Sequence, residues 1–219
     1  MTNFTKRIFM LFFGLFICSL GIVMTMKANI GFAPYDVLHQ GIANSIGMTI
    51  GRVSILIGLI ICIICLFLGE KLGLGTISDM ILIGILIDLF ISLKFIPQMN
   101  GYVSGITLMV AGLFTIAFGI YFYISSGFGA GPRDNLMVIV EKKTGLTVGL
   151  CRGILEISAI LIGWLLGGPV GIGTILYALG ISFCIQIVFS LMKFDPAKIE
   201  HETLGTTSKF LIHFLNLEH

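Results

Sequence analysis

The chain repeats itself with an offset of 98 residues and without a gap, so that residues 8–94 align with residues 106–192. The matches concentrate at residues that shape turns and helix contacts. They pair Gly14 with Gly112, Gly21 with Gly119, Gly31 with Gly129, Gly47 with Gly145, Gly51 with Gly149, Gly69 with Gly167, Gly73 with Gly171, Gly75 with Gly173, Pro34 with Pro132, Asp36 with Asp134, Thr49 with Thr147 and Thr76 with Thr174. An apolar composition alone would not align such residues, so the pattern indicates a duplicated unit.

The composition indicates a membrane protein. Apolar residues make up 57% of the chain and charged residues 11%, and the mean hydropathy is +1.07. Soluble domains carry roughly 25% charged residues. Six segments approach the length of about 20 apolar residues that a membrane helix needs, and we expect spans at 8–28, 52–69, 75–93, 103–124, 150–167 and 173–192.

Each half therefore contains three spans, and an odd number of spans inverts the second half relative to the first. The predicted fold class is an all-α membrane protein whose six transmembrane helices form two inverted three-helix repeats. The first repeat covers 1–98 and the second covers 99–196. Residues 197–219 are expected to form a cytoplasmic tail, and its last residues, Leu217-Glu218-His219, resemble the remnant of an affinity tag.

The distribution of basic residues predicts the orientation of the chain. Ten of the 13 lysines and arginines fall at the end of the spans that holds the N-terminus, whereas Lys27, Arg52 and Lys94 fall at the other end. The positive-inside rule then predicts that both termini are cytoplasmic. The net charge of +2 is too small to indicate a nucleic-acid partner.

The chain breaks after the first span of each half, at 27–36 and 125–134. In both segments a glycine interrupts the helix, and a proline three residues later suits the first turn of a new one. We expect short helices at 34–46 and 132–144, which lie on the surface or dip inward. Backbone that is not helical is tolerated at membrane depth only where it is buried in protein or lines a wet cavity.

Three motifs resemble the YczE branch of the YczE/YyaS/YitT membrane proteins. They are Asn-x-Gly-x-x-Pro-x-Asp-x-Leu from Asn29, Gly-Ala-Gly-Pro-Arg-Asp at 129–134 and Ile-Gly-Trp-Leu-Leu-Gly-Gly-Pro-Val-Gly-Ile-Gly-Thr at 162–174. Tyr35 is a mild departure, because the family often has tryptophan there. The resemblance covers 8–192 and implies a multi-pass protein of the bacterial inner membrane. It brings no set of catalytic or ligand-binding residues.

Seven polar residues at or near the breaks and spans are the candidate substrate-binding set: Lys27, Asn29, Asp36, Asp88, Arg133, Asp134 and Glu156. Charge within the membrane costs a few kcal/mol, so such residues mark either a site or an ion pair that fixes helix packing. Helix N-termini at the breaks would offer partial positive charge to an anionic group. We therefore expect an anionic or zwitterionic small molecule, or an anionic lipid head group, as the ligand.

The repeat helps to weigh these residues individually. Asp36 and Asp134 match one another, which favours a structural role at the start of each short helix. By contrast, Asp88 and Glu156 align with Gln186 and Gly58, and Arg133 aligns with Tyr35. Broken symmetry at a polar position is what a site would show, although neutral drift would show it too.

Enzyme signatures are missing from the sequence, which has no metal-ligand cluster, no Gly-x-Ser-x-Gly motif and no Walker loop. We expect no enzymatic activity and no cofactor. The favoured function is a small secondary transporter or permease. A membrane accessory or regulatory protein and a lipid-handling protein are the alternatives. The expected partners are membrane lipid and an unidentified small-molecule or lipid ligand, and a homo-oligomer is left open.

Overall fold

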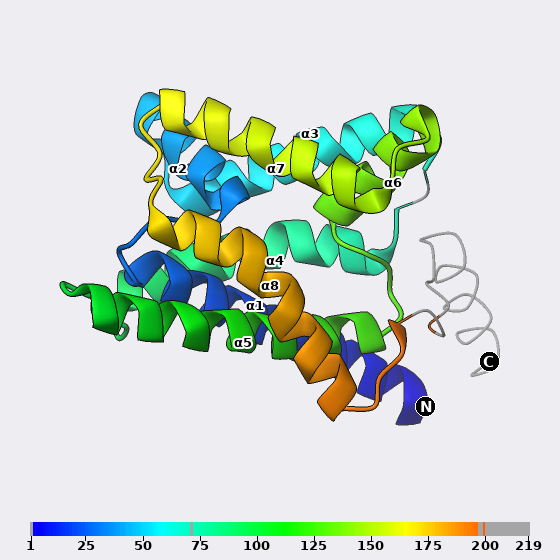
Figure 1. Cartoon of the computed structure of the whole chain (residues 1–219). Coiled ribbons are helices and arrows are strands. Elements are labelled where there is room, and N and C mark those ends of the chain that lie inside the picture. Colours follow the sequence, from blue (N-terminus) through cyan, green and yellow to red (C-terminus); the bar gives the residue numbers. More distant parts are fainter. Residues whose placement is uncertain (1, 71, 197–198, 200–219) are drawn as a thin grey trace.

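The structure is a computed structural model that describes residues 2–70, 72–196 and 199, so most of the predicted tail at 197–219 lies outside the described residues. The described part of the chain folds into eight helices (Figure 1). They are α1 Thr2–Lys27, α2 Pro34–Ile46, α3 Ile50–Phe67, α4 Leu74–Leu93, α5 Tyr102–Ser125, α6 Pro132–Thr144, α7 Val148–Leu165 and α8 Ile172–Leu191.

Six of these helices are long and apolar enough to cross a membrane, namely α1, α3, α4, α5, α7 and α8. Their ends lie within a few residues of the predicted spans, so the prediction of an all-α protein with six such helices is confirmed. The short helices α2 and α6 occupy the predicted ranges 34–46 and 132–144. The inverted orientation of the two halves stays a prediction.

The centre of the fold is the crossing of α1 and α5, the helices that begin the two halves. Glycines bring their backbones together: a Cβ atom on Gly14 would lie 2.8 Å from the carbonyl oxygen of Gly119, and one on Gly21 would lie 2.8 Å from that of Gly112. Small residues permit such close approach between membrane helices. The aligned residues Cys18 and Ile116 meet at this crossing, where the thiol lies 3.7 Å from the carbonyl oxygen.

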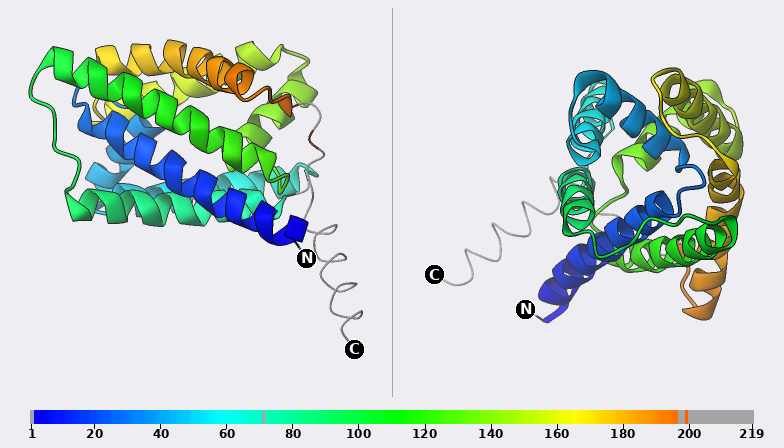
Figure 2. Two further views of the ribbon diagram at one scale, coloured as in Figure 1. Left: turned by 90° about the horizontal axis from the view of Figure 1, so that it is seen from below. Right: turned by 90° about the vertical axis from the view of Figure 1, so that its left-hand side faces the viewer.

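The remaining helices are arranged in layers around this crossing. α4 packs against α1 and α8 packs against α5, while α2, α3, α6 and α7 lie on the opposite side in Figure 1. The start of α1 and the end of α8 lie at the same end of the molecule (Figure 1). Figure 2 shows from a second direction that the long helices surround the first turns of α6.

The two halves differ in the packing of their last two spans. α3 packs closely against α4, but the corresponding helices α7 and α8 are not in extensive contact. α7 instead packs along α2, where Gly163 and Gly168 approach the backbone of Val37. The second half is therefore more open between its last two spans than the first.

Candidate functional site

Each break segment is held against the start of a long helix from the other half. The amide of Gly173 in α8 donates to the carbonyl oxygen of Ile30, and the amide of Gly75 in α4 donates to that of Phe128, both at 2.7 Å. These two hydrogen bonds are equivalent under the offset of 98 residues. They satisfy orphan donors at the starts of α8 and α4, and they fix the position of both breaks.

The glycines of the breaks are needed for their backbone conformation and for close approach. Gly31 has a φ angle of 118° and Gly129 one of 110°, a region that side chains rarely adopt. A Cβ atom on Gly31 would also lie 2.6 Å from the amide nitrogen of Gly171. Pro34 and Pro132 then begin α2 and α6 at the first helical position, as predicted.

A cavity of about 430 Å³ lies between the two break segments, and all eight helices contribute to its wall. Isoleucines from α1, α3, α4, α5 and α8 form much of the apolar part. The polar lining residues are Tyr35, His39, Ser54, Asp79, Tyr123, Arg133, Asp134, Arg152, Glu156 and Tyr177. A small number of converging polar groups in an apolar cavity is typical of a small-molecule site.

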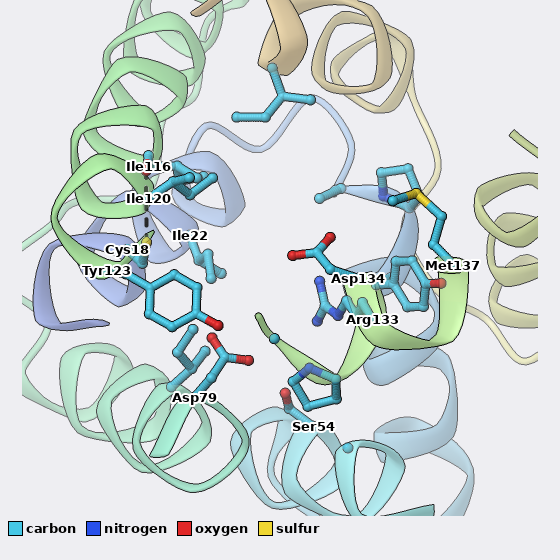
Figure 3. Close-up of a pocket in the computed structure, with 18 of the residues that line it drawn as sticks. Cys18, Ile22, Ser54, Asp79, Ile116, Ile120, Tyr123, Arg133, Asp134 and Met137 are labelled. Atoms are coloured by element: carbon cyan, nitrogen blue, oxygen red, sulfur yellow. Dashed lines mark hydrogen bonds between the residues drawn. The ribbon is translucent and has the colours of Figure 1, made fainter. Parts of the chain in front are cut away.

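Arg133 presents a guanidinium group to this cavity from the first turn of α6 (Figure 3). Its Cζ atom lies 4.5 Å from the centre of the Tyr35 ring, a cation–π contact. Its nearest carboxylate is Asp36, at 4.0 Å, and the side chain makes no hydrogen bond to the described residues. The donors of the guanidinium are therefore available to a ligand in the cavity.

Three carboxylates face the same cavity from different helices. Glu156 forms an ion pair with Arg152 one turn earlier on α7, at 2.8 Å. Asp134 follows Arg133 and is exposed within the cavity. Asp79 comes from α4 and lies beside the second break, since a Cβ atom on Gly131 would be 3.1 Å from its Oδ2 atom. Neither Asp79 nor Asp134 forms an ion pair with the described residues.

Asp36 and His39 form a buried pair at the start of α2, on the first break. Their side chains are 3% and 2% exposed, and His39 Nδ1 lies 3.5 Å from Asp36 Oδ1. Neither of these two atoms has a hydrogen-bond partner among the described residues. Burial lowers the pKa of the His39 imidazole, which favours its neutral form. Asp36 thus lies behind the cavity wall and bears on the site through Arg133.

Two of the predicted site residues, Lys27 and Asn29, belong to the first break but do not line the cavity. The side chain of Asn29 donates to the carbonyl oxygen of Met99 at 3.1 Å, and the amide of Met99 donates to that of Lys27 at 2.9 Å. These bonds join the end of α1 to the loop before α5. Lys27 and Asn29 therefore fix the first break to the loop between α4 and α5.

Asp88 also lies outside the cavity lining, although the sequence places it in the same helix as Asp79. Its carboxylate accepts a hydrogen bond from the amide of Gly51 at 2.9 Å and another from the hydroxyl of Thr49, the N-cap residue of α3. Carboxylates are stabilising at helix N-termini. The described contacts of Asp88 are thus those of a capping residue supplied to α3 by α4.

We predict that the substitution Asp88→Ala destabilises the protein by about 1–2 kcal/mol, because it leaves donors at the start of α3 without their acceptor. The apparent melting temperature in detergent measures this loss. Gln186→Ala is the matched control, since Gln186 occupies the equivalent position on α8, is exposed and makes no hydrogen bond to the described residues. Equal melting temperatures for the two variants would contradict the capping role.

The predicted set thus divides: Arg133, Asp134 and Glu156 line the cavity, Asp36 lies behind it, and Lys27, Asn29 and Asp88 make structural contacts elsewhere. Sequence reasoning missed the lining residues Asp79, Tyr123 and Arg152. Asp79 aligns with Tyr177, and Arg133 aligns with Tyr35. The same broken-symmetry comparison that selected Glu156 would therefore have selected Asp79.

Comparison with known proteins gives relatives over most of the chain. The family of unknown function DUF6198 matches residues 5–190. The "Uncharacterized membrane protein YczE" of Bacillus subtilis (strain 168) is 37% identical over 171 residues, which are 77% of this chain and 78% of that protein. An "Uncharacterized protein" of Haemophilus influenzae (strain ATCC 51907 / DSM 11121 / KW20 / Rd) is 34% identical over 85% of each chain. The "Uncharacterized protein YyaS" of Bacillus subtilis (strain 168) is 32% identical over 74% of this chain and 82% of that protein. No solved structure matches the chain.

Proposed function

The chain belongs to the DUF6198 family of unknown function, and we propose that it is a small secondary transporter for an anionic or zwitterionic small molecule. The matches to YczE and YyaS confirm the family that the sequence resembles. The six apolar helices and these relatives make the chain a multi-span membrane protein. Its transport activity, its place in a bacterial inner membrane and its cytoplasmic termini are parts of the proposal.

The proposal rests on one observation, the incomplete hydrogen bonding of the Arg133 guanidinium group. A guanidinium in a cavity lined largely by apolar side chains, without a hydrogen bond to the described residues, is an incomplete binding group. The side chain is 37% exposed, and its ion pair with Asp36 is long at 4.0 Å, so its N–H donors are open to a ligand. A carboxylate, sulfonate or phosphate would complete it with two parallel hydrogen bonds. The first turn of α6, which contains the amides of Arg133 and Asp134, adds partial positive charge.

The repeated contacts support a transporter over a fixed receptor. Under the offset of 98 residues, Gly14 corresponds to Gly112 and Gly119 corresponds to Gly21. The contact of Gly14 with Gly119 therefore has an equivalent in that of Gly112 with Gly21, and both contacts are present. An axis in the membrane plane that relates 8–94 to 106–192 would pass near this crossing. Inverted repeats with broken helices allow one half to rock against the other around a fixed site. Alternating access to the cavity would follow from such rocking.

A ligand screen tests the proposed function. Purified protein is heated with a library of anionic and zwitterionic metabolites, and stabilising compounds are tested for uptake and counterflow in proteoliposomes. A solute that stabilises the protein and is exchanged across the vesicle membrane supports the proposal. Binding without exchange, or stable co-purification with one partner protein and no solute response, favours an accessory protein instead.

We predict that the segment 128–150 and both termini face the cytoplasm, because ten of the 13 basic residues then lie inside. Single cysteines placed at Lys143 and Asn100, both exposed, test this orientation. An impermeant thiol reagent should label the Asn100→Cys protein in intact cells, and the Lys143→Cys protein only after the membrane is opened. The five native cysteines are buried and free, so they provide a low background. The reverse labelling pattern would overturn the assignment.

A lipid-handling protein is the second candidate, and the parting of α7 and α8 favours it. The cavity is lined by Leu155 on α7 and by Ile181, Ile185 and Phe189 on α8, so an acyl chain would find an apolar wall on that side. Native mass spectrometry in mild detergent separates the candidates. One lipid class retained at fixed stoichiometry, and lost after Arg133→Gln, favours lipid handling over transport of a soluble molecule.

A further inference from the structure

The cavity holds opposite charges that do not neutralise one another. Arg133 and Asp79 both line it, yet they do not form an ion pair. Arg133 is held on the side of Tyr35 and Asp36, whereas Asp79 is held on α4 beside Gly131. Arg133 and Asp79 remain apart within one cavity of about 430 Å³, which leaves room for a ligand between them.

The charges of the lining also argue against a purely anionic guest. Three carboxylates, Asp79, Asp134 and Glu156, face two guanidiniums, Arg133 and Arg152. Arg152 and Glu156 satisfy one another at 2.8 Å, and Arg133 has its long ion pair with Asp36 behind the wall, which leaves Asp79 and Asp134 without a basic partner. The carboxylates of Asp79 and Asp134 would repel a simple anion at the short distances within such a cavity. A molecule with one anionic and one cationic group would complement both signs.

A second and independent observation lies beside Asp79. Tyr123 on α5 is 5% exposed, and its hydroxyl has no hydrogen-bond partner among the described residues. Figure 3 shows the ring of Tyr123 and the carboxylate of Asp79 pointing toward one another at the edge of the cavity. Buried hydroxyls are normally hydrogen-bonded, and an unpaired one requires an explanation. An ammonium group has three donors and needs acceptors of this kind.

We infer that Asp79 and Tyr123 form the cation-binding half of the site, so that the transported molecule is a zwitterion whose ammonium group contacts Asp79 while its anionic group contacts Arg133. The inference rests on the proposed function, because it assigns the substrate class of the same cavity. Asp79 Oδ atoms and the Tyr123 hydroxyl oxygen accept from the ammonium group. No covalent step is involved.

Matched pairs of probes test this inference on the purified full-length protein. The zwitterions are the amino-carboxylates from glycine to 6-aminohexanoate, together with 2-aminoethylphosphonate. Each is compared with the acid of the same length that lacks the amino group, such as propionate for β-alanine and ethylphosphonate for 2-aminoethylphosphonate. We expect at least one zwitterion to bind about tenfold more tightly than its matched anion, because a hydrogen bond to a charged group is gained.

Asp79→Asn should remove that tenfold preference while the dissociation constant of the matched anion stays the same or falls. Tyr123→Phe should reduce the preference by a smaller factor. Glu141→Gln is the control, since it removes a carboxylate from α6 outside the cavity lining. The melting temperature of each unliganded variant shows that it is folded, and Asp79→Ser, which also removes the carboxylate, replaces Asp79→Asn if the latter unfolds.

The outcomes separate this inference from the proposed function. If the anions bind as tightly as the zwitterions in the native protein and in Asp79→Asn, the cation half-site is wrong and the anion site at Arg133 stands. If Asp79→Asn weakens both members of a pair equally, Asp79 acts on the shape of the cavity and the inference also fails. If no probe of either class binds, both the inference and the proposed function are overturned for these chemical classes.

Discussion

We expect the substitution Arg133→Gln to weaken binding of the screened ligand by about 10- to 100-fold. Hydrogen bonds to a charged group contribute about 1.5–3 kcal/mol, and each 1.4 kcal/mol is a factor of ten in affinity. Glutamine keeps one amide donor pair but removes the charge and the contact with the Tyr35 ring. The dissociation constant from calorimetry, and the counterflow rate in proteoliposomes, measure the loss.

Two further variants show whether the guanidinium itself is responsible. Lys143→Gln removes a positive charge from the same helix at an exposed position, and it should leave the affinity unchanged. Arg133→Lys keeps the charge but loses the planar fork and the stacked geometry, so an intermediate affinity is expected. If Arg133→Gln folds with a normal melting temperature and retains full binding, the anion site lies elsewhere and Arg133 serves only to hold α6 near α2.

The short helices were the part of the fold most clearly encoded in local sequence. A glycine that interrupts a helix, followed three residues later by a proline, predicted α2 and α6 with the bounds that the structure shows. Both residues act through backbone geometry, which depends little on the rest of the chain. The ends of the spans were predicted to within two residues, except that α1 begins at Thr2 and not at residue 8, because their length is set by the membrane.

The site was harder to predict, because membership depends on which face of a helix turns toward the cavity. Asp79 and Asp88 are nine residues apart on α4, about two and a half turns at 3.6 residues per turn, so they point in opposite directions. Asp79 shares its face with Ile83 and reaches the cavity, whereas Asp88 shares its face with Gly84 and reaches α3. The sequence shows the spacing, but it does not show which face is which.

The comparison of the two halves gave a partial answer to this question. It selected Glu156, which lines the cavity, and Asp88, which caps α3. Both break the repeat, because a cap and a site each require a side chain on one half only. The ion pair of Arg152 with Glu156 was readable as an i, i+4 pair on one helix face. The contact of Arg133 with Asp36 was not, because it joins the two halves.

The crossing of α1 and α5 should tolerate no side chain at its glycines. A Cβ atom on Gly119 would lie 2.6 Å from the amide nitrogen of Cys18 and 2.8 Å from the carbonyl oxygen of Gly14. These neighbours are backbone atoms, which do not turn aside as a flexible side chain would. Gly119→Ala therefore forces the two helices apart, and overpacking of this kind costs about 1–3 kcal/mol.

Gly119→Leu should have the larger effect, since the whole side chain must enter the contact between the two halves, and we expect little folded protein. The fraction folded during titration with a denaturing detergent, together with the melting temperature, measures both variants. Gly153→Ala on α7 is the control, because a Cβ atom there meets nothing within 4 Å and alanine is the better helix former. If Gly119→Ala proved as stable as Gly153→Ala, α1 and α5 would not cross at these glycines. The position of the cavity between the breaks would then be wrong as well, because it depends on that crossing.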